Sequence, residues 1–137
     1  MNTQIASFSI TNYLFDYVSM DLSKKGNDNL QLNFNTSGLF YEEQSMFELT
    51  FFVTVKSEDK ENAFVSIQCK GHFVFHNKIS FTDIPDYFYG NCIAILFPYV
   101  RSYISIISTQ ANIKGIILPT LNLSSLQSKL RNNTSKK

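Results

Sequence analysis

The sequence predicts an α+β protein in which a four-stranded antiparallel β-meander is followed by one long and one short C-terminal helix, both packed on one face of the sheet. Apolar and polar residues alternate in four segments, which is the period of half-buried strands. After Phe75 the apolar residues recur every three or four positions, which is the period of an amphipathic helix. No repeat or linker divides the chain, so residues 1–137 are expected to form a single domain with a disordered tail over residues 131–137.

The four predicted strands differ in the regularity of their alternation. In the first strand the even positions from Phe8 to Leu22, Leu14 among them, are mostly apolar, but Asn12 and Asp16 interrupt them, which predicts a bend or bulge. The third strand alternates most regularly. The predicted strands cover residues 6–22, 30–35, 47–56 and 63–75, and turn-forming residues lie at 24–28 and 57–62.

Two helices are predicted in the C-terminal part of the chain. Pro98 suits the first turn of the longer helix, because a residue there needs no N–H donor. The apolar stripe of this helix is Val100, Tyr103, Ile104, Ile107 and Ala111. Asn122 can cap a shorter helix that carries Leu126 and Leu130. Residues 84–90, which precede the longer helix, are predicted to be an irregular aromatic segment.

Aromatic residues are the unusual feature of the composition, with 13 Phe, 7 Tyr and no Trp. A small domain buries only about 60 to 70% of the surface of its unfolded chain, so one copy cannot readily hide this many rings. The surplus predicts a homo-oligomer, an apolar binding surface or both. Compositional drift is the alternative explanation for part of it. The formal net charge of +1 gives no reason to expect a nucleic-acid partner.

The sequence predicts neither a membrane span nor a secretory signal. Residues 93–100 form the longest apolar run, but this run contains Pro98 and is far shorter than the roughly 18 to 20 residues that cross a bilayer. The N-terminal segment MNTQIASFSI lacks the basic and continuous apolar regions of a signal peptide. Cys69 and Cys92 form no CxxC pair and are expected to be free, buried thiols. A cytoplasmic location is therefore expected.

No pattern in the sequence predicts catalysis, a cofactor or a metal site. His72 and His76 share one face of a predicted strand but lie about 13 Å apart at ~3.3 Å per residue, which is too far to share a metal. Cys69 alternates with the apolar residues of its strand, and Cys92 lies in an apolar run where burial raises the pKa of a thiol. The glycines are too scattered for a phosphate loop. The residue chemistry indicates a binding or assembly protein rather than an enzyme.

Two motifs resemble the SecB protein-export chaperone family. Residues 92–102, CIAILFPYVRS, are similar to its signature C-P-x-I-L-F-P-Y-A-R-E, and residues 118–123, LPTLNL, are similar to its motif L-x-P-[IV]-N-F. Weaker collinear matches in the predicted strands extend the resemblance over almost the whole chain. Two positions depart from the signature, since Ile93 replaces a proline and Ser102 replaces an acidic residue.

The resemblance implies an ATP-independent holdase, assembled as a dimer of dimers, that binds unfolded polypeptide clients in apolar grooves without a cofactor. The candidate groove residues are Leu30, Leu32, Phe34, Tyr87, Phe88, Phe97, Tyr99 and Leu126. The first three match second-strand positions that the family uses for clients, and Phe97 and Tyr99 match its signature. Tyr87 and Phe88 are included for their aromatic density and Leu126 as part of a lid helix. The alternatives are core packing for Leu30, Leu32 and Phe34, packing that seats the longer helix for Phe97 and Tyr99, and docking onto the sheet for Leu126.

The resemblance also suggests partners. Asp21 matches an acidic position with which the family docks on the SecA translocase ATPase during protein export, but Ile67 stands at the corresponding fourth-strand position. The sequence closes on Lys136 and Lys137 rather than on the family's acidic extension. Delivery of preproteins to the Sec translocase therefore competes with a second hypothesis, in which the chain serves a single partner such as the antitoxin of a toxin–antitoxin system.

Overall fold

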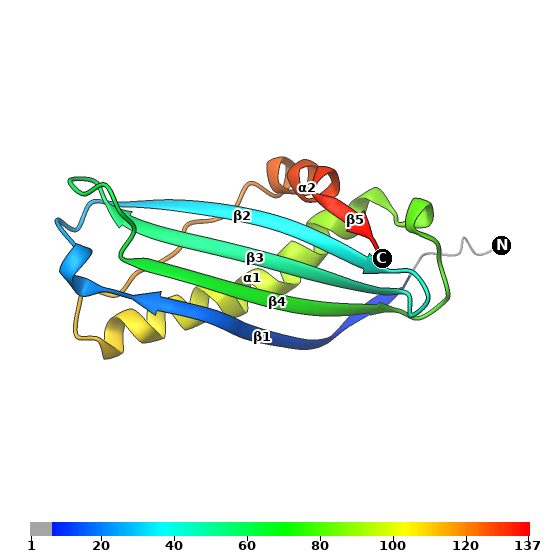
Figure 1. Cartoon of the computed structure of the whole chain (residues 1–137), viewed down its shortest axis with the longest axis horizontal. Helices are drawn as coiled ribbons and strands as arrows, with labels where there is room; N and C mark the ends of the chain where they lie inside the picture. Colours follow the sequence, from blue (N-terminus) through cyan, green and yellow to red (C-terminus); the bar gives the residue numbers. More distant parts are fainter. Residues whose placement is uncertain (1–6) are drawn as a thin grey trace.

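The computed structural model describes residues 7–137, so Ala6 and the first six residues of the N-terminal segment tested above for a signal lie outside the described range. The sheet contains β1 (Phe8–Met20), β2 (Leu30–Tyr41), β3 (Met46–Ser57), β4 (Val65–Phe75) and β5 (Thr134–Lys136). Two helices, α1 (Asp86–Gln110) and α2 (Leu123–Asn132), follow β4, and α1 crosses one face of the sheet (Figure 1). The predicted α+β class is confirmed.

The strand order corrects the predicted meander. The sheet runs β1-β4-β3-β2-β5, so only β2, β3 and β4 form a meander, and β1 lies beside β4 as in a Greek key. The chain crosses from β1 to the opposite side of the sheet through the short 3₁₀ helix η1 (Leu22–Lys24). Alternation specifies the face on which a residue lies but not which strand is its neighbour, and this is why the sequence did not predict the order.

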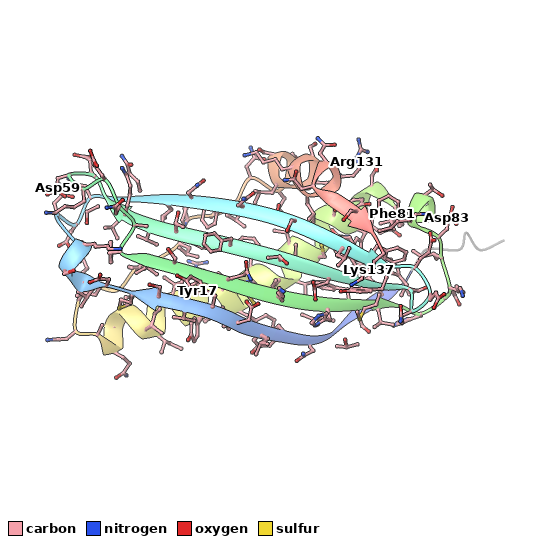
Figure 2. All side chains as sticks on the ribbon, viewed as in Figure 1. Tyr17, Asp59, Phe81, Asp83, Arg131 and Lys137 are labelled. Atoms are coloured by element: carbon pink, nitrogen blue, oxygen red, sulfur yellow. The ribbon has the colours of Figure 1, made fainter. Side chains whose placement is uncertain are left out.

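The predicted irregularity of β1 is present as two register shifts, one between Ile10 and Asn12 and one between Phe15 and Tyr17. Each shift exchanges the two faces of the strand, because side chains alternate with a period of two. Leu14 consequently points away from the helices and is 55% exposed. The expectation that Leu14 shares a buried face with Phe8 is therefore wrong. Tyr17 also lies on this outer face, where it stacks on Phe52 (Figure 2).

Helix α1 begins at Asp86, well before the predicted start, and Pro98 lies in its interior rather than in its first turn. A proline in the interior of a helix removes one backbone hydrogen bond, and this is why the sequence analysis placed Pro98 in the first turn of the helix. Tertiary packing outweighs this loss, because the buried stripe continues without a break on both sides of Pro98. The stripe recurs every four residues at Phe88, Cys92, Leu96, Val100, Ile104 and Ser108. The segment predicted to be irregular is thus mostly the first turns of α1.

The same helix is long and apolar enough, by length and composition alone, to cross a membrane. One face of α1 nevertheless lies on the sheet. Gly71 in β4 permits this close approach, since a Cβ atom there would lie 3.1 Å from a methyl group of Leu96. Burial of this stripe in the domain core identifies α1 as the central helix of the fold.

The core lies between the sheet and α1, and β3 supplies its centre. The five residues predicted for the inner face of β3 are all fully buried: Phe47, Leu49, Phe51, Val53 and Val55. This part of the prediction is confirmed, because a strand in the middle of a sheet that is covered on one face shows the full contrast between its two sides.

The C-terminal tail is ordered, which corrects the expectation of a disordered segment over residues 131–137. Helix α2 extends to Asn132, and β5 then pairs in parallel with the end of β2, with Gly38 opposite Thr134. The N–H group of Lys137 donates a hydrogen bond of 2.8 Å to the carbonyl oxygen of Phe40. An edge strand has unpaired backbone N–H and C=O groups, which can pair with a further strand of almost any sequence. The polar composition of residues 131–137 was therefore not a reliable sign of disorder.

Candidate binding groove

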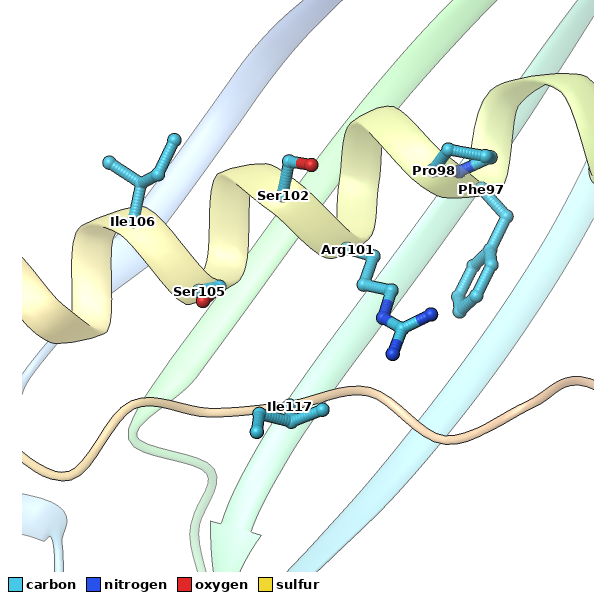
Figure 3. Close-up of a pocket in the computed structure, with 7 residues that line it drawn as sticks. All are labelled: Phe97, Pro98, Arg101, Ser102, Ser105, Ile106 and Ile117. Atoms are coloured by element: carbon cyan, nitrogen blue, oxygen red, sulfur yellow. The ribbon is translucent and has the colours of Figure 1, made fainter.

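A hollow of about 610 Å³ opens between α1 and the extended connection that leads to α2, residues 111–122 (Figure 3). Helix α1 forms one wall and Ile117 of the connection forms the other. The hollow is lined by Phe97, Pro98, Arg101, Ser102, Ser105, Ile106 and Ile117. Ile106 is 58% exposed and Ile117 is 73% exposed, so two large aliphatic side chains face solvent in this hollow.

Two smaller hollows adjoin the first. One, of about 230 Å³, shares Ile117 with it and extends to Leu30 and Leu32 at the start of β2. The other, of about 250 Å³, shares Phe97 and Arg101 with it and extends along the connection to Leu121 and Leu123. Because these hollows share lining residues, they form one surface that follows the connection. We call the three hollows together the connection groove.

A buried serine fixes the connection beside α1. The Ser108 hydroxyl donates to the carbonyl oxygen of Ile104 at 2.8 Å and accepts a hydrogen bond of 2.9 Å from the N–H group of Ile116. Ile116 and Leu118 are buried, whereas Ile117 between them is exposed. The connection therefore behaves like a short strand, with alternate side chains anchored in the core and presented to the groove.

The groove carries more positive than negative charge. Arg101 is exposed and forms no ion pair with any residue between 7 and 137. At the β2 end Lys25 lies 2.6 Å from Asp28, and Lys114 lines the same hollow. The pKa of Asp28 is lowered, mainly because Lys25 donates a hydrogen bond to its carboxylate and adds positive charge, with a smaller contribution from Lys114. Asp28 is thus held as a carboxylate, and the groove as a whole has this one anion and three cations, Lys25, Arg101 and Lys114.

Four of the predicted groove residues gather at this surface. Leu30, Leu32 and Phe97 line the groove. Phe34 lies under Phe97, with 6.3 Å between the ring centroids, and also packs 6.0 Å from Phe51 of the core. Phe34 therefore supports the wall that Phe97 forms.

The other four predicted residues lie elsewhere. Phe88 is 0% exposed, and its ring packs 4.7 Å from Phe8, so the structure places it in the core and not on a binding surface. Leu126, predicted to lie on the apolar side of a lid helix, is also buried and lines none of the three hollows, which agrees with the alternative of packing onto the fold. Tyr99 stacks on Tyr13 at 4.3 Å beside a separate hollow, and Tyr87 is exposed outside all of these hollows. Aromatic density did not distinguish helical core residues from surface residues, because it carries no information about the helix face.

The sequence reasoning missed Arg101, Ile106, Ile117, Leu121 and Leu123 as lining residues. A usable signal was present at two of them. Arg101 follows Phe97 by four residues and therefore lies on the same side of a helix. Ile117 lies between two apolar neighbours in an extended segment, so one of these side chains had to point away from the others.

The position expected to dock a translocase has a local structural role. Asp21 caps η1: its carboxylate accepts hydrogen bonds from the Ser23 hydroxyl at 2.6 Å and from the Ser23 N–H group at 3.1 Å. These two bonds lower the pKa of Asp21. Ile67, which stands where the family has a second acidic position, is fully buried. An acidic docking patch is therefore not formed by this pair.

The histidine and the two cysteines that were considered for catalysis lie on the outer face of the sheet or in the core. His72 lies 3.0 Å from Glu48 on the outer face of the sheet. Burial raises the pKa of Cys69 to about 12 and also raises the pKa of Cys92, so both thiols are protonated near neutral pH. Among residues 7–137 no cluster of three or more His, Cys, Asp or Glu side chains has the geometry to hold a metal.

A sheet covered by one long helix, with an open apolar groove beside that helix, defines a binding protein of the α+β class. The family described as preprotein translocase subunit SecB matches residues 5–133, so the chain belongs to the SecB family of non-enzymatic chaperones. The resemblance in the two motifs is thereby confirmed.

Two similar proteins place this assignment in context. A solved SecB-like chaperone of Mycobacterium tuberculosis, in complex with a ChAD peptide from the HigA1 antitoxin, superimposes with a TM-score of 0.64 at 12% identity, over 83% of this chain and 90% of that one. At this identity the likeness shows the fold alone. An uncharacterized protein of Methanocaldococcus jannaschii is 48% identical over 40 residues, which is 29% of this chain and 26% of that protein.

Proposed function

We propose that this protein is a cytoplasmic, ATP-independent holdase that binds unfolded polypeptides in the connection groove. The observation that carries the proposal is the pair of exposed aliphatic side chains, Ile106 and Ile117, in a hollow that continues to Leu30 and Leu32. An unfolded segment that covers them gains about 25 cal/mol per Å² of apolar surface buried, before the cost of ordering. This binding needs no defined sequence, no nucleotide and no reaction.

We further propose that the protein is a homo-oligomer, with a dimer of dimers as the expected state. The supporting observation is a second set of exposed apolar side chains near the other side of α1 and along the sheet edge formed by β1. This set comprises Tyr13, Leu14, Tyr17, Val18, Ile95 and Tyr99. Association of copies would cover this surface, and several grooves in one assembly would bind one long client with higher avidity than a single groove.

A dedicated chaperone for one partner, such as an antitoxin, is the second candidate function. It is favoured by the burial of Ile67, which leaves Asp21 without the acidic neighbour needed for a SecA-docking patch. The antitoxin peptide bound to the mycobacterial SecB-like chaperone is a precedent in the same fold. Two measurements distinguish the candidate functions. Binding of the purified protein to SecA supports delivery of preproteins, and co-purification of a single stoichiometric partner supports a dedicated chaperone.

The direct test of holdase function is the suppression of aggregation of an unfolded model protein, without nucleotide, at stoichiometric amounts. Ile117→Asp is expected to abolish protection, because a carboxylate then replaces the most exposed apolar side chain of the groove. Leu22→Asp is the matched control, since Leu22 is exposed in η1 outside the groove and the substitution adds the same charge. Absence of protection by the unmodified protein at several-fold excess would contradict the proposal.

A further inference from the structure

Arg101 lies at the centre of the connection groove. It belongs to both the largest hollow and the one that leads to Leu121, and Figure 3 shows its guanidinium between α1 and the connection, on the side of Phe97. The other residues that line the largest hollow are apolar or carry a neutral hydroxyl group: Phe97, Pro98, Ser102, Ser105, Ile106 and Ile117. A cation is therefore presented within an otherwise apolar or neutral wall.

Among residues 7–137, no carboxylate forms an ion pair with this cation. The residues that line the two hollows around Arg101 include no Asp or Glu. In the hollow that extends to Leu30 and Leu32, Lys25 forms an ion pair with Asp28, so the positive charge of Lys114 is left unbalanced there. The chain as a whole carries a formal net charge of only +1, so the positive character is local to the groove rather than a property of the entire surface.

Charge complementarity then indicates the occupant. A segment that buries apolar side chains in the groove displaces water from around Arg101, which strengthens the attraction between its guanidinium and an anion. The planar guanidinium binds a carboxylate through two parallel hydrogen bonds, whereas a lysine in the client would be repelled. We propose that the connection groove selects extended apolar polypeptide segments that carry Asp or Glu between their apolar residues. This inference rests on the proposed holdase function and specifies its substrate class.

The test compares three extended peptides with the same apolar residues and a central pair of Glu, Gln or Lys, labelled for fluorescence anisotropy and titrated with the full-length protein. We expect the Glu peptide to bind about five- to ten-fold more tightly than the Gln peptide at low ionic strength and the Lys peptide to bind most weakly. The difference is expected to shrink as salt is added, because mobile ions screen exposed charges.

Substitutions assign the preference to the groove. Arg101→Gln is expected to make the affinities for the Glu and Gln peptides equal, and Arg101→Glu to reverse the order of the Glu and Lys peptides. Lys56→Gln is the matched control, because it removes one positive charge from the outer face of β3 and should leave the Glu preference unchanged. Light scattering on each variant shows whether assembly is intact. If a variant fails to assemble, the order of affinities for the three peptides on the unmodified protein still tests the preference for acidic segments.

The outcomes separate this inference from the function on which it rests. Equal binding of the Glu and Gln peptides, or preference for the Lys peptide, overturns the acidic selectivity while holdase function stands. A Glu preference that persists in Arg101→Gln and Lys114→Gln also overturns it, because the selectivity then lies outside the groove. Failure to bind any peptide, together with failure to suppress aggregation, overturns both.

Discussion

The two halves of α1 have similarly apolar sequences but different surroundings. In the first half, six buried residues lie between Phe88 and Leu96, and α2 packs close enough that a Cβ atom on Gly90 would lie 2.6 Å from the Gln127 side chain. In the second half only Val100, Ile104 and Ser108 are buried, and the connection lies alongside at the distance that leaves the groove open. The same helix therefore belongs to the core where α2 covers it, and it forms a wall of the groove where only the connection lies beside it.

The largest expected effect comes from breaking the covered half. Phe88→Ala removes a fully buried ring that packs against Phe8, Phe47 and Phe75, and a cavity of this kind costs about 3–5 kcal/mol of unfolding free energy. Denaturant unfolding measures this loss. Tyr87→Ala is the matched control: its side chain is 41% exposed, so a change below about 0.5 kcal/mol is expected. Equal losses for the two variants would contradict the assignment of Phe88 to the core.

The open half can be disturbed at the hydroxyl that positions the connection. Ser108→Ala leaves the buried N–H group of Ile116 without its partner, which costs about 1–3 kcal/mol. The same change is expected to weaken client binding, because Ile116 and Ile117 are then no longer held beside α1. Denaturant unfolding and peptide anisotropy measure the two effects.

Thr109→Ala provides the control for Ser108→Ala. The Thr109 hydroxyl donates to the Ser105 carbonyl oxygen at 2.8 Å, which is the same type of bond to the preceding turn, but it makes no hydrogen bond to the connection. A small change in stability and unchanged client affinity are expected. If Ser108→Ala and Thr109→Ala behave alike, the connection is fixed by other contacts.

The sequence predicted the parts of this molecule in which one face of an element is buried along its whole length. The alternation in β3 is complete, and the inner face was assigned correctly from Phe47 to Val55. Strand order was not predictable in this way, since the pairing of β1 with β4 depends on contacts between residues far apart in the chain. The start of α1 was also missed, because the intrinsic preference of Pro98 for a first turn opposes packing that only the folded sheet supplies.

The groove was predicted in part for a related reason. Leu30, Leu32 and Phe97 were found through the resemblance to a family, which carries information about tertiary structure. Arg101 and Ile117 were missed: their spacing indicates the side on which each residue lies, but whether a groove opens there depends on the distance between α1 and the connection. Such a distance is set by anchors such as Ser108, and no periodicity in a single chain reports it.

The smallest expected effect concerns what holds α2 over the covered half. Removal of residues 134–137 deletes β5, the Lys137 hydrogen bond to Phe40 and the hydroxyl bond of 2.6 Å from Thr134 to the Leu130 carbonyl oxygen. These few hydrogen bonds at the edge of the sheet are expected to contribute about 1–2 kcal/mol in total. Hydrogen exchange should become faster in α2 and at the edge of β2, while exchange in β3 stays unchanged.

Lys136→Ala separates the backbone contribution of β5 from its charge. This variant removes only an exposed ion pair of 3.7 Å with Glu42, so less than about 0.5 kcal/mol is expected and α2 should exchange as in the unmodified protein. If the truncated chain also retains slow exchange in α2, then the burial of Leu126 and Leu130 holds this helix without β5. Faster exchange in α2 would instead show that the packing of α2 over the first half of α1 depends on the pairing of β5 with β2. In that case β5 would help to determine where the buried part of α1 ends and the groove begins.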